Sequence, residues 1–586
     1  MPVLSVTGLT VERSSDGAVI VDDVNFELDA GEVLGVVGES GSGKSTMALA
    51  LLGFARRGAR IGTGSVIIAG EDLLRLGGAS LRSARQRLVA YVPQDPATAL
   101  NPTLSIRTQL LEGLRGERRP AVDQAREVLR EVGLPDDDAF LARRPQQLSG
   151  GQQQRIAIAM AVIARPAVIV LDEPTTGLDV STQARVLSLV KELCEAHRIA
   201  AIYVSHDLAV VADVADQVIV MYGGQTVERS SAHSVLTAPR HPYARALLDA
   251  VPSPRLRQQL RPIPGRAPQP GDSSGGCVFR ARCAFAAPAC ADATPPLRAS
   301  APGHLVRCIR DEVIEAEPPV RLRDRPDRPE VVGQALALDA RNLVASYGAR
   351  EVLHGVSLQL DPGRCLAVVG ESGSGKTTLS KCLIGLHDDV SGTIELRGRQ
   401  LALSARHRDA LARRQLQYVF QNPYGSLNPR RSVRQSLSVA APGGAGRRVL
   451  RQRLRESLER VELPERVLDA YPADLSGGQR QRVAIARALL ADPAVLLCDE
   501  VTSALDVSVQ ASVIELLRAL LDDGLAMVFV THDLAVVRSI ADDVLVLSDG
   551  HVVERGEVGA VLDRPVHPYT QSLLRDTLEL PAASAG

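Results

Sequence analysis

Two stretches of the chain have residue types at a spacing that could bind the phosphates of a nucleotide. Residues 38–46 read GESGSGKST and residues 370–378 read GESGSGKTT, so both fit the phosphate-binding-loop (P-loop) pattern G-x-x-x-x-G-K-[ST]. Glycines let backbone N–H groups point at phosphate oxygens, the lysine reaches the β- and γ-phosphates, and the next hydroxyl holds Mg²⁺. The expected contacts are Gly38, Ser40, Gly41, Gly43, Lys44, Ser45 and Thr46, and Gly370, Ser372, Gly373, Gly375, Lys376, Thr377 and Thr378.

The surroundings of both stretches fit that interpretation. Apolar residues 33–37 and 366–369 predict a buried strand that leads into each P-loop. We expect a helix over residues 44–54, whose positive N-terminal end would add to the anion site. Alternating apolar residues at 4–11 and 24–28 predict two short strands before the first P-loop.

A glutamine and a serine-glycine motif follow each P-loop. Gln94 and Gln421 lie after a predicted strand in Pro/Asn-rich loops, where they could touch Mg²⁺ or an attacking water or could be ordinary loop residues. The sequence LSGGQ occurs at 148–152 and 475–479, before predicted amphipathic helices over 153–164 and 480–490. Its hydroxyl and bare N–H groups suit an anion, although a plain serine N-cap is the simpler alternative. The residues concerned are Ser149, Gly151, Ser476 and Gly478.

Carboxylates and a histidine complete each set. A strongly apolar strand ends in two acidic residues in each half, where the Asp could support Mg²⁺ and the Glu could orient or deprotonate water. A later β-branched run ends in a histidine that could contact a γ-phosphate, although a lone histidine can equally be structural. These residues are Asp172, Glu173 and His206, then Asp499, Glu500 and His532.

The order P-loop, Gln, LSGGQ, Asp-Glu, His, intact twice, resembles that of ABC-type ATPases. The resemblance implies an α/β fold of two tandem P-loop ABC-type ATPase domains, each with a helical subdomain, in an internal pseudo-dimer. It implies ATP held between the P-loop of one half and the LSGGQ of the other, with Mg²⁺ as cofactor. Site 1 then joins Lys44, Gln94, Asp172, Glu173 and His206 to Ser476 and Gly478; site 2 joins Lys376, Gln421, Asp499, Glu500 and His532 to Ser149 and Gly151.

The residues expected to hold Mg²⁺ are Ser45, Gln94, Asp172, Thr377, Gln421 and Asp499. The family also places an aromatic residue near the start of each domain to stack on adenine. Tyr347 fits that place in the second half, whereas Arg13 occupies it in the first. A guanidinium can stack on a base, but this departure puts the nucleotide affinity of site 1 in question.

Four of the eight cysteines lie between the halves, at Cys277, Cys283, Cys290 and Cys308. Their wide, irregular spacing suits a [4Fe–4S] cluster better than zinc, which favours C-x₂₋₄-C pairs, and unligated thiols are a third alternative. The segment resembles the C-terminal extension of peptide-importer ATPases, some of which carry such a cluster. We expect His304 to be a loop residue, and the remaining cysteines to lie in the core: Cys194, Cys365, Cys382 and Cys498.

The repeat predicts a first domain at 1–250, an irregular cysteine-containing extension at 251–320, a charged, Pro-rich linker at 321–333 and a second domain at 334–586. His-Pro-Tyr recurs at 241–243 and 567–569, where it could simply be a turn that opens a short helix. Together with Leu-Asn-Pro at 100–102 and 427–429, it resembles the oligopeptide/dipeptide branch of ABC import ATPases.

Composition narrows the partners. The net charge of −1 and an aromatic content of 3% argue against a nucleic-acid surface. There is no signal-like N-terminal segment and no apolar run of membrane-spanning length, so we expect a soluble chain whose link to a membrane goes through a partner. The resemblance implies that this chain is a peripheral subunit on the cytoplasmic face of the membrane. The resemblance implies import of oligopeptides, dipeptides or similar small solutes with two permease subunits and an extracytoplasmic substrate-binding protein. The alternative is a soluble tandem ABC ATPase that acts on DNA or ribosomes.

Overall fold

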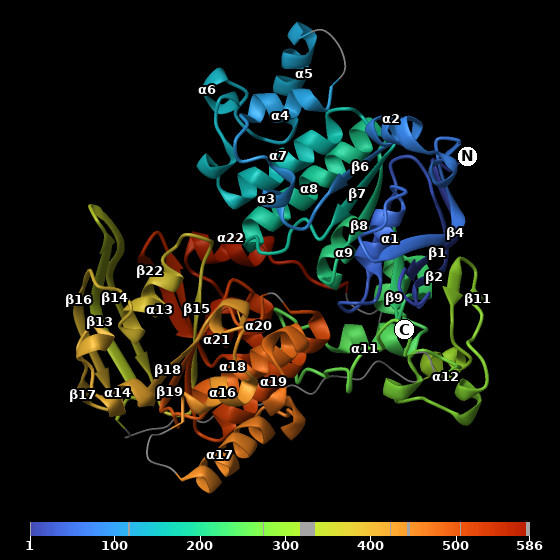
Figure 1. The fold of residues 1–586 in the computed structure, drawn as a ribbon. Helices are drawn as coiled ribbons and strands as arrows, with labels where there is room; N and C mark the ends of the chain where they lie inside the picture. The colour runs from blue at the N-terminus through green and yellow to red at the C-terminus, as the bar shows by residue number, and fades with distance from the viewer. Residues whose placement is uncertain are drawn as a thin grey trace.

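The computed structural model describes residues 2–114, 118–272, 275–316, 335–421, 423–441, 446–503 and 505–581. Two α/β halves of similar build lie beside each other, and the extension lies against the first half (Figure 1). The predicted linker at 321–333 falls outside the described residues.

The centre of the first half is a parallel set of buried strands. The strands β3 (Val33–Val37), β7 (Val168–Asp172) and β8 (Ala200–Val204) are buried at every position, and β6 (Val89–Val92) pairs with β7 at the end of the set. Strands covered on both faces are expected to be apolar, and these are, except for Asp172 at the end of β7. Their carboxyl ends share one edge, so the loops that follow β3, β6, β7 and β8 meet there.

An antiparallel part completes this sheet. The strands β1 (Leu4–Arg13) and β2 (Val19–Leu28) cover the two predicted strands, and β4 (Ala59–Ile68) pairs with β1. The strands β9 (Gln217–Tyr222) and β10 (Gln225–Ser231) link this part to β3.

The second half repeats the design in two sheets. The six-stranded sheet has the order β18-β19-β20-β15-β21-β22, and the four-stranded sheet has the order β14-β13-β16-β17. The bounds are β13 (Leu338–Tyr347), β14 (Arg350–Leu360), β15 (Cys365–Val369), β16 (Val390–Leu396), β17 (Arg399–Gln400), β18 (Leu416–Val419), β19 (Val495–Asp499), β20 (Ala526–Val530), β21 (Asp543–Ser548) and β22 (His551–Glu557).

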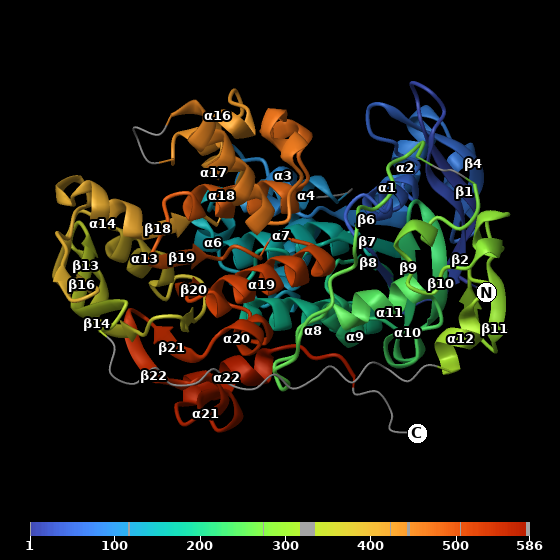
Figure 2. The ribbon, with the colours of Figure 1, turned by 90° about the horizontal axis from the view of Figure 1, so that it is seen from below.

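Each half carries a separate group of helices. In the first half these are α4 (Ile106–Glu112), α5 (Arg118–Glu131) and α7 (Gly150–Val162), and in the second α16 (Val433–Ser438), α17 (Arg447–Arg460) and α18 (Gly477–Leu489) (Figure 2). The helices predicted from 153 and 480 thus begin at Gly150 and Gly477. The helix predicted over 44–54 is α1 (Lys44–Ala50), and a turn with Gly53 at φ 65° follows it.

The extension is less irregular than the sequence suggests. Its strands β11 (Arg298–Ala301) and β12 (His304–Val306) pair with each other, and β12 also pairs with β10 of the first half. The expectation that His304 is a loop residue is therefore wrong. Its side chain is buried, and its Nε2 lies 2.7 Å from Oε1 of Glu228.

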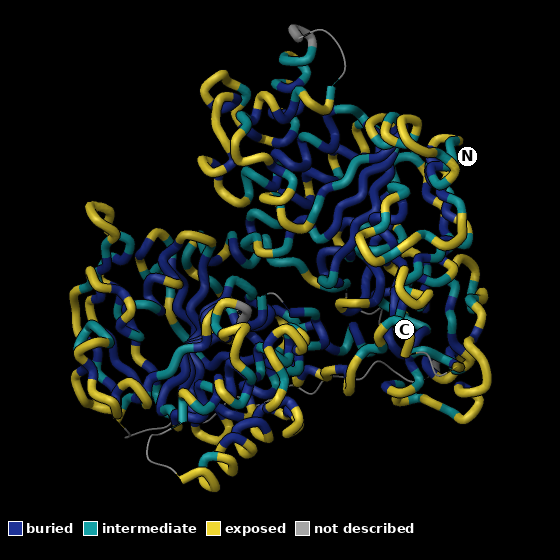
Figure 3. Tube along the Cα trace, viewed as in Figure 1, coloured by how far each residue is buried: buried dark blue, intermediate teal, exposed yellow. Residues whose placement is uncertain are grey.

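The buried core runs through the strands of both halves (Figure 3). One apolar cluster includes residues of both halves, among them Val218 from the first and Leu517 from the second. Leu260 and Ile263 of the extension belong to the same cluster. The extension therefore contributes to the packing between the halves.

Candidate nucleotide-binding sites

Each P-loop wraps around its own lysine. Gly38 has φ 152°, and a Cβ there would lie 2.2 Å from the carbonyl oxygen of Met221, so only glycine fits. Lys44 Nζ donates to the carbonyl oxygens of Gly38 at 2.6 Å and Glu39 at 3.0 Å. Lys376 makes the same pair of bonds in the second P-loop, at 2.8 and 2.7 Å. Burial lowers the pKa of Lys44, against the attraction of nearby carboxylates that include Asp506 of the other half.

Two of the three predicted Mg²⁺ residues of the first half are in direct contact. Ser45 Oγ donates to Oδ1 of Asp172 at 2.9 Å, and the hydroxyl of Tyr91 donates to Oδ2 of the same carboxylate at 2.8 Å. In the second half Tyr418 donates to Oδ2 of Asp499 at 2.5 Å. Burial raises the pKa of Asp499, and the charge of Glu500 adds to the shift. A hydroxyl and a carboxylate are oxygen donors of the kind that Mg²⁺ takes alongside phosphates.

The strand-end glutamates connect the predicted glutamine and histidine. Gln94 Nε2 donates to Oε2 of Glu173 at 2.8 Å, and Nδ1 of His206 lies 3.0 Å from the same oxygen. Burial would raise the pKa of Glu173, but the hydrogen bond and charge of His206 outweigh it, so that pKa is lowered.

The second half repeats this trio. Gln421 Nε2 donates to Oε2 of Glu500 at 2.5 Å, and Nδ1 of His532 lies 3.4 Å from Oε1 of Glu500. The carboxylates are arranged alike, because Glu173 and Glu500 both have a positive φ, of 49° and 47°. Each half therefore brings a glutamine, a glutamate and a histidine together.

Both LSGGQ motifs begin a helix. Ser149 Oγ accepts from the N–H of Gln152, whose side chain accepts from the N–H of Ser149, and Ser476 does the same with Gln479. The simpler alternative, a serine N-cap, is therefore part of the structure. The second glycine has a packing reason as well, since a Cβ on Gly478 would lie 2.4 Å from Cγ1 of Val509.

The first P-loop also contacts the second half. Ser40 donates from its backbone N–H and its hydroxyl to Oδ1 of Asp506, at 3.0 and 2.9 Å. Asp506 lies just before α19 (Val507–Asp522), whose Val509 packs against the LSGGQ glycine Gly478. The LSGGQ end of the second half is thus linked to the first P-loop.

Sequence reasoning assigned no role to Asp506 or to its counterpart Asp179. A signal was present, because each follows its Asp-Glu pair at the same distance and directly precedes a helix. The two nevertheless differ in structure. Asp179 caps α8 (Val180–His197), accepting from the N–H of Thr182 at 2.9 Å, whereas Asp506 makes no side-chain cap bond to α19.

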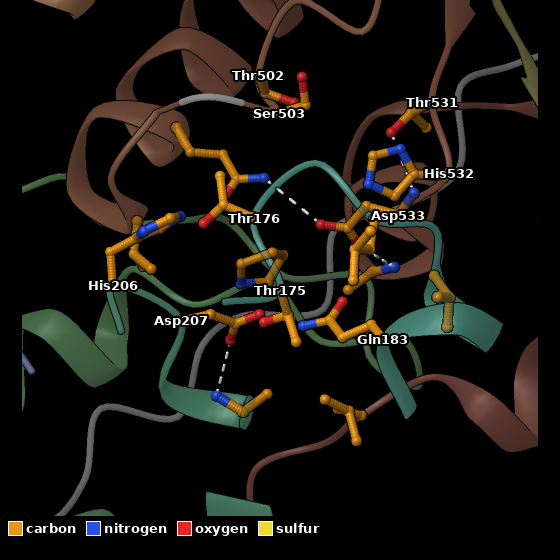
Figure 4. A pocket seen from close by; sticks show the side chains of 18 of the residues that line it. Thr175, Thr176, Gln183, His206, Asp207, Thr502, Ser503, Thr531, His532 and Asp533 are labelled. Carbon is orange, nitrogen blue, oxygen red and sulfur yellow. Dashed lines mark hydrogen bonds between the residues drawn. The ribbon is translucent and has the colours of Figure 1, made fainter. Parts of the chain in front are cut away.

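A polar cavity of about 150 Å³ lies between the halves (Figure 4). His206 and Asp207 line it from the first half, and His532 and Asp533 line it from the second. Burial raises the pKa of Asp207. The charge of His206 partly offsets this rise, and the charge of Asp533 adds to it. The residues that follow β8 and β20 therefore face each other across the boundary between the halves.

The two predicted adenine positions are occupied differently. Tyr347 is 52% exposed, and its ring centroid lies 4.7 Å from that of His387. Arg13 is bound to the carboxylate of Asp16 at 2.8 and 2.6 Å, and it donates to the carbonyl oxygen of Pro270 at 3.2 Å. Its guanidinium is thus engaged by protein groups.

The His-Pro-Tyr segments open α11 (Pro242–Asp249) and α22 (Pro568–Asp576), which confirms the predicted turn and short helix. They also reach the P-loops, which the sequence did not indicate. The hydroxyl of Tyr243 accepts from the N–H of Glu39 at 2.8 Å, and the hydroxyl of Tyr569 accepts from the N–H of Glu371 at 2.8 Å.

All four cysteines of the extension line one small cavity, and all are free thiols. Burial raises the pKa of Cys283 to about 11 and that of Cys308 to about 12. Within the described residues, no three or more His, Cys, Asp or Glu side chains are grouped so that they could hold a metal ion. The prediction of an iron–sulfur cluster therefore gains no support from an ion-binding group. The other four cysteines are buried, as expected: Cys194, Cys365, Cys382 and Cys498.

Comparison with known families settles the class. An ABC transporter model matches residues 21–176 and 353–503. The chain belongs to the ABC transporter family. A model for the C-terminal region of oligopeptide/dipeptide transporters matches residues 227–290 and 553–585, which include both His-Pro-Tyr segments. As a member of this family, the chain is an ATP hydrolase whose activity is coupled to transport, with two tandem ATPase domains.

Similar proteins span nearly the whole chain. The oligopeptide transport ATP-binding protein OppD of Mycobacterium tuberculosis is 37% identical over 98% of both chains. The glutathione import ATP-binding protein GsiA of Escherichia coli K12 is 36% identical over 98% of this chain and 89% of its own. A solved bacterial ABC transporter cassette, MJ0796, is 30% identical, with a TM-score of 0.34, over 38% of this chain and 98% of its own. Among the described residues, no helix is long and apolar enough to cross a bilayer.

Proposed function

We propose that this protein is the ATPase subunit that energises import of oligopeptides, dipeptides or similar small peptides. The observation that carries the proposal is the duplicated His-Pro-Tyr segment, whose tyrosine bonds each P-loop and which belongs to the region matched by the oligopeptide/dipeptide transporter model. Its partners are two permease subunits and an extracytoplasmic substrate-binding protein, and it sits peripherally on the cytoplasmic face of the membrane. The near-neutral charge argues against the alternative of a soluble ATPase acting on DNA or ribosomes.

We propose two composite ATP sites. Site 1 joins the first P-loop to Ser476 and Gly478, and site 2 joins the second P-loop to Ser149 and Gly151. The bonds from Ser40 to Asp506 support this pairing, because they bring the LSGGQ end of one half to the P-loop of the other. The domain boundaries follow the repeat, at 1–250, 251–320, 321–333 and 334–586.

The chemistry follows from the contacts at each glutamate. Ser45 and Asp172 would hold Mg²⁺, and the bound ion would supply charge neutralisation at the β- and γ-phosphates. Glu173 has a lowered pKa and is ionised at neutral pH, so it can orient and deprotonate a water molecule. Gln94 and His206 hold that carboxylate in place, and His206 is positioned to contact the γ-phosphate. Thr377, Asp499, Glu500, Gln421 and His532 have the same roles at site 2.

We place a permease segment in a groove of the second half. A cavity of about 270 Å³ lies beside Gln421 and is lined by Leu386, Tyr418 and Phe420, of which Leu386 is 54% exposed. The first half exposes Phe54 at the matching end of its P-loop helix. Leu386→Glu is expected to release the permeases from the purified complex while ATP binding persists, with Val439→Glu, another exposed apolar site, as the control.

We also propose that the four thiols of the extension hold a [4Fe–4S] cluster. The shared cavity supports this, because it brings four cysteines with wide sequence spacing to one place. Anaerobic purification should give a brown protein with about four irons per chain by the stoichiometry of such a cluster, and Cys283→Ser should lose them. Zinc instead of iron in the purified protein would contradict the cluster.

The importer function is tested by uptake of a labelled tripeptide. Cells with the native chain are compared with cells that carry Glu173→Gln plus Glu500→Gln, which removes both proposed bases. We expect uptake only with the native chain, at equal amounts of protein in the membrane fraction. Unchanged uptake with an ATPase-inactive double variant would overturn the proposal, and recovery of the chain with ribosomes or DNA instead of permeases would favour the alternative.

A further inference from the structure

The first P-loop carries a buried ion pair to the cysteine extension. Arg282 donates from Nη1 to Oε2 of Glu39 at 2.5 Å and from Nη2 to Oε1 at 3.0 Å. Only 4% of the Arg282 side chain and 8% of the Glu39 side chain are exposed. Such a bidentate ion pair fixes the relative orientation of the two side chains as well as their distance. Glu39 is the second residue of the P-loop, and Lys44 donates to its carbonyl oxygen, so the pair fixes the loop beside the phosphate-binding lysine.

Arg282 binds more than the P-loop. Its Nε donates to the carbonyl oxygen of Pro264 at 2.7 Å, and Nη2 donates to that of Ile263 at 3.2 Å. Nη1 also donates to the hydroxyl of Tyr222 at 3.2 Å. These bonds and the ion pair together use the five N–H groups of a guanidinium. A lysine has neither five donors nor the planar fork.

Ile263 and Pro264 end a strap (residues 254–264) that runs along the second half. The N–H of Leu260 donates to Oε1 of Glu515 at 3.0 Å, and that of Ile263 donates to Oγ of Ser508 at 3.2 Å. Glu515 and Ser508 both belong to α19, which begins next to Asp506. Since Asp506 bonds Ser40, the first P-loop is tied to α19 both directly and through Arg282.

The second P-loop has no equivalent. Glu371 matches Glu39 and receives the same tyrosine contact from Tyr569. Across the parts of the chain that the structure describes, no salt bridge joins the Glu371 carboxylate to a basic side chain. The two otherwise similar loops therefore differ in one buried ion pair and in the segment attached to it.

We propose that Arg282 is a positioning residue for ATP site 1, which it couples to the cysteine extension and makes unequal to site 2. The proposal rests on the assignment of the two sites in the proposed function. Arg282 acts through Glu39 on the shape of the first P-loop, and it holds the strap against α19 of the opposing half. Cys283 follows it directly in the chain, so a change at the cysteine cavity reaches the loop through one peptide unit.

The test measures each site alone in the full-length chain. Titration with the fluorescent analogue mant-ATP reports site 1 in a Lys376→Ala background and site 2 in a Lys44→Ala background. Arg282→Gln is expected to weaken binding at site 1 about tenfold and at site 2 less than about twofold, where tenfold corresponds to about 1.4 kcal/mol. Arg282→Lys should fall between native and Gln, because it keeps the charge and loses the fork. Arg266→Gln, an exposed arginine of the same extension, is the control and should change neither site.

A purely structural role gives a different result. In that case Arg282→Gln would lower the thermal midpoint of the chain and leave the mant-ATP affinity of site 1 unchanged, or it would weaken mant-ATP binding at both sites equally. Either outcome overturns the proposal. If Arg282→Gln does not fold, Glu39→Gln tests the same ion pair by removing the charge of the other partner. It should weaken mant-ATP binding at site 1. Binding that persists in Lys44→Ala plus Lys376→Ala would instead show that the proposed assignment of the two ATP sites is wrong.

Discussion

The two halves make the same contacts around their proposed catalytic glutamates, in different surroundings. Around Glu173 and Glu500 the glutamine and histidine partners repeat, and each P-loop lysine bonds the same two carbonyl oxygens. The differences lie farther from the glutamates. Arg13 occupies the position that is equivalent to Tyr347 in the repeat, and Glu39 forms an ion pair with Arg282. The two halves are thus alike in the contacts of the proposed catalytic glutamates and differ at the proposed adenine position and at the second residue of the P-loop.

The largest effect should come from the proposed catalytic glutamates. Glu173→Gln and Glu500→Gln each remove a proposed general base, and we expect the double variant to lower steady-state ATPase activity about 100-fold or more, the usual size of this contribution, whereas a single variant keeps the activity of the other site. The measurement is phosphate release by the purified chain with its permeases. Glu459→Gln on the exposed face of α17 is the matched control. Full activity in one variant would mean that only one site turns over.

The adenine positions should give the next largest effect. Arg13→Tyr frees Asp16 and offers a ring for stacking, and a base stacked on an aromatic side chain gains about 1–3 kcal/mol. We expect about tenfold tighter ATP binding at site 1, measured with Lys376→Ala to silence site 2. Tyr347→Arg should weaken site 2 by a similar factor in the Lys44→Ala background. If Arg13→Tyr leaves the affinity unchanged, the Arg13 position does not contact the base.

The cross-half contact offers a smaller test. Asp506→Ala removes two exposed hydrogen bonds to Ser40, each worth about 0.5 kcal/mol at the low end of the usual range, so we expect about fivefold weaker ATP binding at site 1. Asp179→Ala removes a helix cap, which costs about 1 kcal/mol of stability. It should therefore lower the thermal midpoint and leave the affinity of site 2 nearly unchanged. Equal losses of affinity in the two variants would show that Asp179 also reaches across once ATP is bound.

The sequence predicted the P-loops and the strands that lead into them well, because residues close together in the chain determine them. Apolar runs predicted β3 and β15, the glycine pattern predicted the loops, and the resemblance to ABC-type ATPases placed Glu173 and Gln94 in one site. The surroundings of the P-loops depend on contacts between residues far apart in the chain. Nothing near Arg282 in the sequence indicates Glu39, which lies 243 residues away, and nothing near His304 indicates that Glu228 draws it into a strand. Asp506 and Asp179 have the same local sequence context and still bond differently.

The smallest expected effect concerns pH and the pair formed by His206 and Glu173. Burial would lower the pKa of His206, but the hydrogen bond and charge of Glu173 raise it above the usual value of about 6.5. A raised histidine pKa contributes stability that is fully present below pH 6.5 and is lost as the pH rises through the folded-state value. The thermal midpoint of His206→Gln should therefore lie below that of the native chain at pH 6 and approach it at alkaline pH. His532→Gln removes a longer contact, of 3.4 Å, and should lower the thermal midpoint less. A difference for His206→Gln that is constant from pH 6 to 9 would mean that the ion pair of His206 with Glu173 does not form in solution.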